Sequence, residues 1–215
     1  MEHFNLTKKL HTDVLEEKYG PVHSEVVRHD DEVREAHLID AQGISRTYAI
    51  TFFTFDRSNE ELCTIDDEIR QGGLIGKVFR DHGYEIRKNV IEVFLIDLPD
   101  AIKSKMKTDS AQAKVRLAEF YAKKLGETPI IYGVVSEIYS PDFRPAEINE
   151  VDKQQENPTT IALDAAGISK EEIWERLGRN NDFSDLADKV ETARVEGASI
   201  TATLVQQVEN YVSRK

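Results

Sequence analysis

The sequence predicts an α+β protein, in which helices flank an antiparallel sheet. Three early segments, 22–28, 33–39 and 45–55, have strand-like sequences, the third is dense in Tyr, Ile, Thr and Phe, and only short turns separate them. Two later segments, 84–98 and 130–139, are also rich in β-branched and aromatic residues. The predicted order is a helix, a meander of three strands, two helices, a strand, a short helix and a pair of strands. This order favours antiparallel pairing over the helical crossovers that parallel strands require.

The chain opens with a predicted helix over 6–18, in which leucine and valine recur at helical spacing. Gly20-Pro21 ends it. The strand 33–39 should place Glu35 and His37 on one face, and Arg34 on the other with Ala36 and Leu38, because side chains alternate along a strand.

A marked helix is predicted after the third strand. Ser58 and Glu61 have the spacing of a capping box, and Gly72-Gly73 would end the helix. A second short helix is expected over 74–81. Beyond the strand 84–98, Pro99 can open another short helix to about residue 107.

Two interpretations are open for 114–124. The composition favours a helix, but a strand that forms a hairpin with the next segment fits the turn at Gly126. We prefer the hairpin. The following segment, GETPIIYGVVSEIYSP, contains a largely apolar strand with Glu137 near its end. This glutamate either lies in solvent at a frayed strand end or is placed there for chemistry, because desolvating a carboxylate is costly.

The character of the chain changes after residue 145. Residues 146–215 carry 14 acidic and 8 basic side chains, a net charge of −6 out of −12 for the whole chain. Helical patterns are visible before Trp174 and over 184–195 and 199–212. We therefore predict two parts, an α+β domain over 1–145 and an acidic helical appendage over 146–215. The appendage is a candidate surface for a protein partner or for a homo-oligomer.

Composition excludes several classes of function. The net charge of −12 disfavours nucleic-acid binding, which needs clustered lysine and arginine. No apolar run approaches the roughly 20 residues of a membrane helix, and the N-terminus lacks a signal-peptide core. The single cysteine, Cys63, fits a reducing cytoplasm. No motif for a metal or a nucleotide is present, so no cofactor is expected.

Four segments, taken in order, resemble the chorismate lyase family, whose fold is shared by the effector-binding domains of some transcription regulators. They are the opening LTKKL, VREAHLIDAQGISRTYAI with its Arg-Glu-x-x-Leu strand, LIGKVF followed by EIRKNVIEV, and GETPIIYGVVSEIYSP. The similarity covers about residues 5–143. It is carried by order and spacing, since none of the four motifs is specific alone.

The resemblance implies an enzyme that eliminates pyruvate from chorismate to give 4-hydroxybenzoate without a cofactor. Arg34 would bind the ring carboxylate, and Glu137 would lie at the oxygen substituent of the ring. The resemblance further assigns substrate-binding positions to Ile75, through its backbone N–H, and to Gly76, Arg87 and Leu6.

These residue types suit the chemistry. A guanidinium binds a carboxylate through two parallel hydrogen bonds. A glutamate in an apolar pocket would favour its protonated form and serve as a general acid. The alternatives are that Arg34 and Glu137 are surface residues and that Ile75 only packs. At the level of function, the alternatives are a module that binds a small cyclic or aromatic carboxylate without turnover, and an interaction protein that uses its C-terminal helices.

Overall fold

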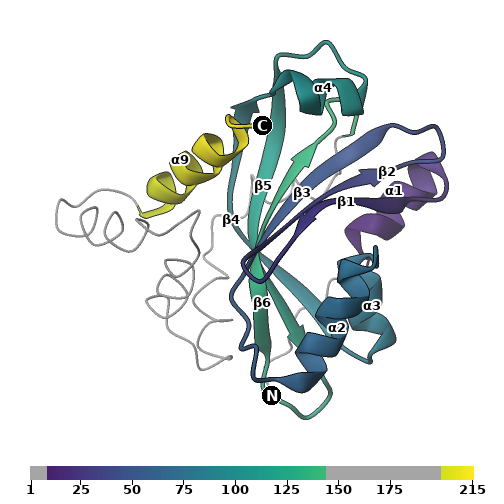
Figure 1. Ribbon diagram of the computed structural model, residues 1–215, viewed down its shortest axis with the longest axis vertical. Coiled ribbons are helices and arrows are strands. Elements are labelled where there is room, and N and C mark those ends of the chain that lie inside the picture. The colour runs from purple at the N-terminus through teal and green to yellow at the C-terminus, as the bar shows by residue number, and fades with distance from the viewer. Residues whose placement is uncertain (1–8, 144–199) are drawn as a thin grey trace.

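The computed structural model describes residues 9–143 and 200–215, and its centre is one six-stranded antiparallel sheet. The spatial order of the strands is β1-β2-β3-β6-β5-β4 (Figure 1). The predicted antiparallel α+β class is confirmed. The strands are β1 (His23–His29), β2 (Val33–Ile39), β3 (Ser45–Phe53), β4 (Glu85–Asp97), β5 (Gln112–Lys123) and β6 (Ile130–Tyr139).

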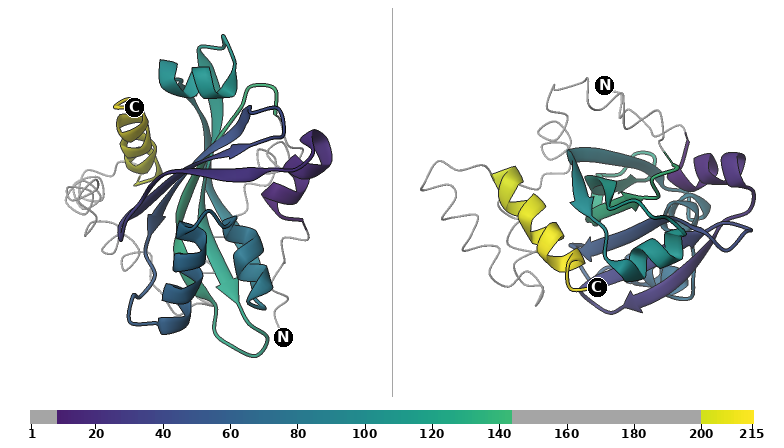
Figure 2. Two further views of the ribbon diagram at one scale, coloured as in Figure 1. Left: turned by 45° about the vertical axis from the view of Figure 1, so that its right-hand side comes forward. Right: turned by 90° about the horizontal axis from the view of Figure 1, so that it is seen from above.

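Helices cover both faces of the sheet (Figure 2). On one side lie α1 (His11–Tyr19), α2 (Glu60–Arg70) and α3 (Ile75–Asp81). The opposite side carries α9 (Ile200–Val212), and α4 (Asp100–Met106) packs into the same apolar core as α9. We call the first side the inner face and the second side the outer face. Among the described residues, no helix has the length and apolar character needed to cross a membrane.

The segment 114–124 is a strand, as the hairpin interpretation predicted. β5 pairs antiparallel with β6 from Val115↔Ile138 to Ala122↔Ile130. Its helix-favouring residues are overridden because apolar side chains on both of its faces pack into cores. This pairing matters for function, since it brings Arg116 directly opposite Glu137.

Two predicted helix starts are wrong. The first helix begins at His11 and not at residue 6, with Leu10 at its N-cap in an extended conformation. The second begins at Glu60, and its cap is Asn59, whose side chain accepts a hydrogen bond from the Leu62 backbone N–H at 3.1 Å. Ser58 therefore does not cap it. Asparagine and serine cap equally well, so the sequence alone does not separate two adjacent candidates.

The last helix packs on the body of the protein. Leu204, Val208, Tyr211 and Val212 of α9 belong to the same buried cluster as side chains of five strands, β2 to β6. The helix predicted over 199–212 is therefore confirmed, and it covers the outer face of the sheet (Figure 1). The other predicted helices of the C-terminal part, before Trp174 and over 184–195, lie outside the described residues.

Candidate functional site

A cavity of about 370 Å³ lies between the inner face of the sheet and the N-terminal ends of α1 and α3. Small side chains open this space. Ala49 of β3 stands beside Glu137 in the sheet register, and Gly76 of α3 lies against Leu10, where an added Cβ would come within 3.1 Å of a leucine methyl. The remaining wall is largely aliphatic, with one aromatic ring, Phe120. The volume is in the range of small-molecule sites.

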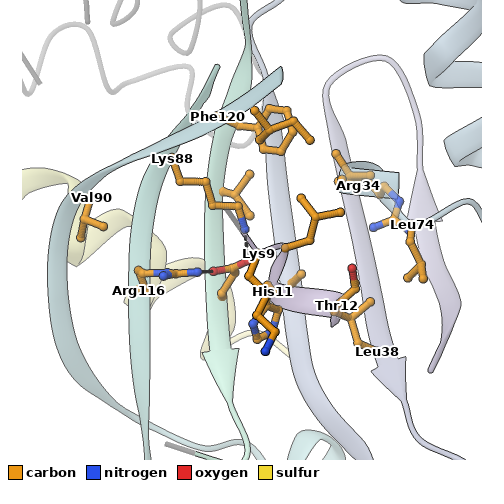
Figure 3. Close-up of a pocket in the computed structure, with 17 residues that line it drawn as sticks. Lys9, His11, Thr12, Arg34, Leu38, Leu74, Lys88, Val90, Arg116 and Phe120 are labelled. Carbon is orange, nitrogen blue, oxygen red and sulfur yellow. Dashed lines mark hydrogen bonds and ion pairs between the residues drawn. The ribbon is translucent and has the colours of Figure 1, made fainter. Parts of the chain in front are cut away.

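Arg34 and Glu137 line the same cavity, as expected from the family resemblance. Figure 3 shows Arg34 on one side of this cavity and Lys88 and Arg116 on the other. Arg34 and Glu137 lie on different strands, since β3 stands between β2 and β6. The register places Arg34 opposite Thr51 and Glu137 opposite Ala49. Two strand spacings and an offset of two residues put their backbone positions roughly 12 Å apart. The cavity is thus long enough to have two chemically distinct ends.

One end of the cavity holds Arg34 without a carboxylate. Its guanidinium donates to the Ser24 hydroxyl at 2.6 Å and to the Gly73 carbonyl at 3.4 Å, and Nε is buried with no hydrogen-bond partner. Among the described residues, no acidic side chain pairs with it. Burial lowers the pKa of Arg34 to about 10, with Tyr132 and Asp66 opposing the shift, so the side chain is still charged near neutral pH.

The other end is a network centred on Glu137. Arg116 donates to its Oε2 through Nε at 2.9 Å and NH2 at 2.6 Å, and the Tyr139 hydroxyl donates to the same oxygen at 2.8 Å. Lys88 donates to Oε1. Burial alone would raise the pKa of Glu137, but the charges of Arg116 and Lys88 outweigh it and hold the pKa well below the ordinary value.

Glu137 is therefore ionised in the free protein, which corrects the expectation of a protonated general acid. That expectation assumed an apolar pocket around the carboxylate. In the structure the carboxylate lies between two cations, and β5 and β4 supply these cations from positions whose pairing the sequence alone does not show. An ionised carboxylate accepts a proton more readily than it donates one.

His11 adds a neutral group to the cavity wall. Its Nε2 lies 2.8 Å from the Thr47 hydroxyl, and its ring packs against Tyr139 and Phe143. Burial lowers the pKa of His11 to about 3, although the nearby Glu137 charge opposes the shift. The imidazole is thus uncharged at neutral pH, and the charge of the cavity comes from its lysines, its arginines and Glu137.

The other predicted site residues divide into three groups. Ile75 and Gly76 line the cavity, and Ile75 is the first residue of α3, where a backbone N–H has no acceptor within the helix. Arg87 does not line it: Ile86 and Lys88 do, so alternation along β4 turns Arg87 to the outer face. Leu6 lies outside the described residues.

The sequence did not indicate several polar side chains that line the cavity, among them His11, Thr12, Lys88 and Arg116. Lys88 is next to the predicted Arg87 in the sequence. The sequence alone did not show which of the two faces the cavity, because a shift of one residue moves a side chain to the other face of the sheet. Arg116 lies in the segment that was ambiguous between helix and strand. No local motif marks His11 or Thr12.

Within the described residues, no group of three or more His, Cys, Asp or Glu side chains is arranged to hold a metal ion. The described lining residues include four basic side chains and one acidic one, which makes the cavity positive within an acidic protein. An anionic ligand fits such a field. In comparisons with known proteins, no family model matches the chain, and none of the curated proteins matches it.

Proposed function

We propose that this protein binds chorismate, or a closely similar cyclic dicarboxylate, in the cavity and eliminates pyruvate from it. One observation carries the proposal: a buried guanidinium, Arg34, has no carboxylate partner and lines the same cavity as a second cationic centre, Lys88 with Arg116. A buried charge without a counter-charge is costly in the free protein. A carboxylate of the ligand would supply the missing partner.

The substrate chemistry suits an ionised Glu137. In the elimination, the ether bond between the ring and the enolpyruvyl oxygen breaks, and the neighbouring ring carbon loses its hydrogen as a proton. The electron pair of that C–H bond completes the aromatic ring. The departing enolate takes up a proton on carbon and becomes pyruvate, so the proton count balances. Glu137 would accept the ring proton as a general base.

The cations around Glu137 would serve the same step. Lys88 and Arg116 keep the carboxylate ionised, and they stabilise negative charge that develops on the departing enolpyruvyl oxygen. Arg34 would hold the ring carboxylate at the far end, so that the ring lies between the two centres. The aliphatic walls and Phe120 exclude water from the ring.

The direct test is to incubate the purified protein with chorismate and to measure 4-hydroxybenzoate and pyruvate by chromatography. Glu137→Gln should lower kcat by about 10²–10⁴-fold, the contribution of one positioned proton acceptor. Glu119→Gln is the matched control, since Glu119 is a buried glutamate of β5 that does not line the cavity. Stoichiometric formation of both products by the wild-type protein, and not by Glu137→Gln, supports the proposal.

A second candidate function is binding without turnover. The observation that favours it is the strong pairing of Glu137 with Arg116 and Lys88, which makes this carboxylate a weaker base than a free one. In this case chorismate and 4-hydroxybenzoate should both raise the melting temperature of the protein, and no product should form. Folded protein that neither binds nor converts these compounds would exclude both functions.

A further inference from the structure

A second unpartnered polar group lies on the wall of the cavity that Arg34 lines, namely the hydroxyl of Thr12. Thr12 is the second residue of α1, it is 7% exposed, and its Oγ1 is buried without a hydrogen-bond partner. It lines the cavity, and in Figure 3 its hydroxyl points toward the end at which Arg34 lies. Buried hydroxyls in folded proteins nearly always have a partner, so this exception requires an explanation.

The two unpartnered groups are chemically complementary to one planar anion. Arg34 Nε carries an N–H that can only donate, and the Thr12 hydroxyl can turn its hydrogen to the same acceptor. A carboxylate has two oxygens and accepts several hydrogen bonds at once. A water molecule or a neutral carbonyl could also accept both hydrogen bonds, but only an anion such as a carboxylate neutralises the guanidinium as well.

The position of Thr12 on its helix adds to the attraction. α1 begins at His11, and Lys9, Leu10, His11 and Thr12 all line the cavity, so the N-terminal end of the helix is turned to it. The first backbone N–H groups of a helix have no acceptor within the helix, and this end carries a partial positive charge. An anion near Thr12 therefore meets a favourable field from the helix as well as from Arg34.

We infer that Thr12 is a specificity-determining residue, which donates a hydrogen bond to the carboxylate that Arg34 binds. The inference rests on the proposed function, because it concerns the ligand of the same cavity. It goes beyond that function by assigning the choice of a carboxylate, over a neutral group of the same shape, to a residue of α1. Thr12 positions and selects the ligand and takes no part in the bond-breaking step.

The test compares 4-hydroxybenzoate with 4-hydroxybenzamide, which has the same ring and a neutral amide. Dissociation constants are measured by calorimetry for the wild-type protein and for Thr12→Val, which replaces the hydroxyl with a methyl group of similar size. We expect Thr12→Val to weaken 4-hydroxybenzoate binding by about ten- to a hundredfold, the effect of losing a hydrogen bond to a charged group. The loss for the amide should be several-fold smaller, so the preference for the acid shrinks.

A thermal readout separates this role from a structural one. Thr12→Val removes an unsatisfied buried hydroxyl, so the melting temperature of the free protein should stay the same or rise. Ser136→Ala is the control, because Ser136 also has a buried, unpartnered hydroxyl, lies on the outer face of the sheet and does not line the cavity. It should change binding of neither compound. Thr12→Ser keeps the hydroxyl and should bind the acid within about threefold of wild type, while Thr12→Ala gives a second variant without it.

Three results would overturn the inference. One is an unchanged dissociation constant for 4-hydroxybenzoate in Thr12→Val and Thr12→Ala. Another is an equal loss in Ser136→Ala, which would indicate a general packing effect. The third is wild-type protein that binds neither 4-hydroxybenzoate nor chorismate, which would end the proposed function as well. Normal wild-type binding with an unaffected Thr12→Val removes only the role of Thr12, so the two failures are distinguishable.

Discussion

Arg34 and Glu35 are neighbours in the chain, and they show how differently the two faces of the sheet treat a buried charge. Both side chains are almost fully buried, at 2% and 1% exposure. On the outer face, Glu35 accepts hydrogen bonds from the hydroxyls of Tyr48 and Tyr211 and from the Lys215 ammonium group. On the inner face, Arg34 has a hydroxyl and a carbonyl and no carboxylate.

Their pKa values shift for opposite reasons. Burial would raise the pKa of Glu35, but the hydrogen bonds from Lys215, Tyr211 and Tyr48 outweigh it, and the pKa lies below its ordinary value. Burial lowers the pKa of Arg34 to about 10, and the opposing effects of Tyr132 and Asp66 are smaller than the effect of burial. The contacts on the outer face thus stabilise the charge of Glu35 by more than burial destabilises it. On the inner face, the contacts of Arg34 do not offset the effect of burial on its charge. A structural role explains the first, and the ligand that we propose for the cavity would explain the second.

The largest effect that tests this comparison is on stability. Glu35→Met should lower the free energy of unfolding by about 2–5 kcal/mol, because two buried tyrosine hydroxyls lose their carboxylate acceptor. Urea denaturation followed by circular dichroism measures it. Glu25→Gln is the control, since Glu25 lies in the exposed ion pair with Lys105, where the expected change is under about 1 kcal/mol. Equal losses in the two variants would contradict a special role for Glu35.

Arg34→Met should show the reverse pattern. The variant removes a buried cation that has no direct ion-pair partner among the described residues and only a more distant attraction to Asp66, so the free energy of unfolding should stay within about 1 kcal/mol of wild type or rise. Binding of 4-hydroxybenzoate should weaken by about a hundredfold, since a charge-assisted contact to the carboxylate is lost. The same urea titrations and calorimetry report both quantities. A stability loss as large as that of Glu35→Met would show that the buried guanidinium stabilises the fold, and it would contradict a role in ligand binding alone.

Side-chain alternation along β2 was predictable from the sequence, and so was most of the strand order along the chain. The alternation places Arg34 with Ala36 and Leu38, and Glu35 with His37, as the structure has them. Arg34 and Glu137 were identified by the resemblance to a family, and neither has a local pattern that marks a site. Periodicity determines which face a side chain occupies, but it does not determine which strands become neighbours.

The remaining site residues depend on contacts between distant segments. Arg116 reaches Glu137 only because β5 pairs with β6, and Lys88 reaches it from the edge strand β4. One of the hydrogen-bond donors to Glu35 was equally unpredictable, because Tyr211 is 176 positions away in the chain. A one-residue shift assigned the cation of β4 to Arg87. An error of one residue assigns the side chain to the wrong face of the sheet. It is detected only when the structure shows which neighbouring side chains line the cavity.

The two faces also share one property, a buried neutral histidine, which predicts how stability depends on pH. Burial lowers the pKa of His11 on the inner face to about 3 and of His37 on the outer face to about 4. In the unfolded chain both have the ordinary value near 6.5. Between pH 6.5 and 4 the unfolded chain therefore binds protons that the folded protein does not, and the free energy of unfolding falls as the pH falls.

Each histidine contributes at most about 1.4 kcal/mol per pH unit in this window. Urea denaturation at pH 7.5, 6.5, 5.5 and 4.5 should show the decline, with little change between the first two values. His37→Phe keeps a ring to stack on Tyr48 and removes one titrating group, so the slope between pH 6.5 and 5.5 should drop to about half. At lower pH, carboxylates with lowered pKa values such as Glu35 and Glu137 add to the decline in both proteins. A variant slope equal to that of wild type would mean that other groups control the acid transition.

The smallest predicted effect concerns the anchoring of α9 and tests whether the faces act independently. Tyr211→Phe removes one of three donors to Glu35 and the acceptor of a 3.2 Å hydrogen bond from Arg28, while its ring can still pack edge-on against Phe52. We expect the free energy of unfolding to fall by about 1 kcal/mol, since Tyr48 and Lys215 still hold the carboxylate. Tyr48→Phe should cost a similar amount.

Binding of 4-hydroxybenzoate should be the same in Tyr211→Phe as in wild type. Glu35 and Arg34 project from adjacent positions of one strand, but all three donors to Glu35 lie on the side away from the cavity. A change of more than about threefold in the dissociation constant would show that displacement of Glu35 reaches Arg34 through the backbone of β2. In that case α9 would control the cavity as well as cover the sheet, and the separation between a structural outer face and a ligand-binding inner face would not hold.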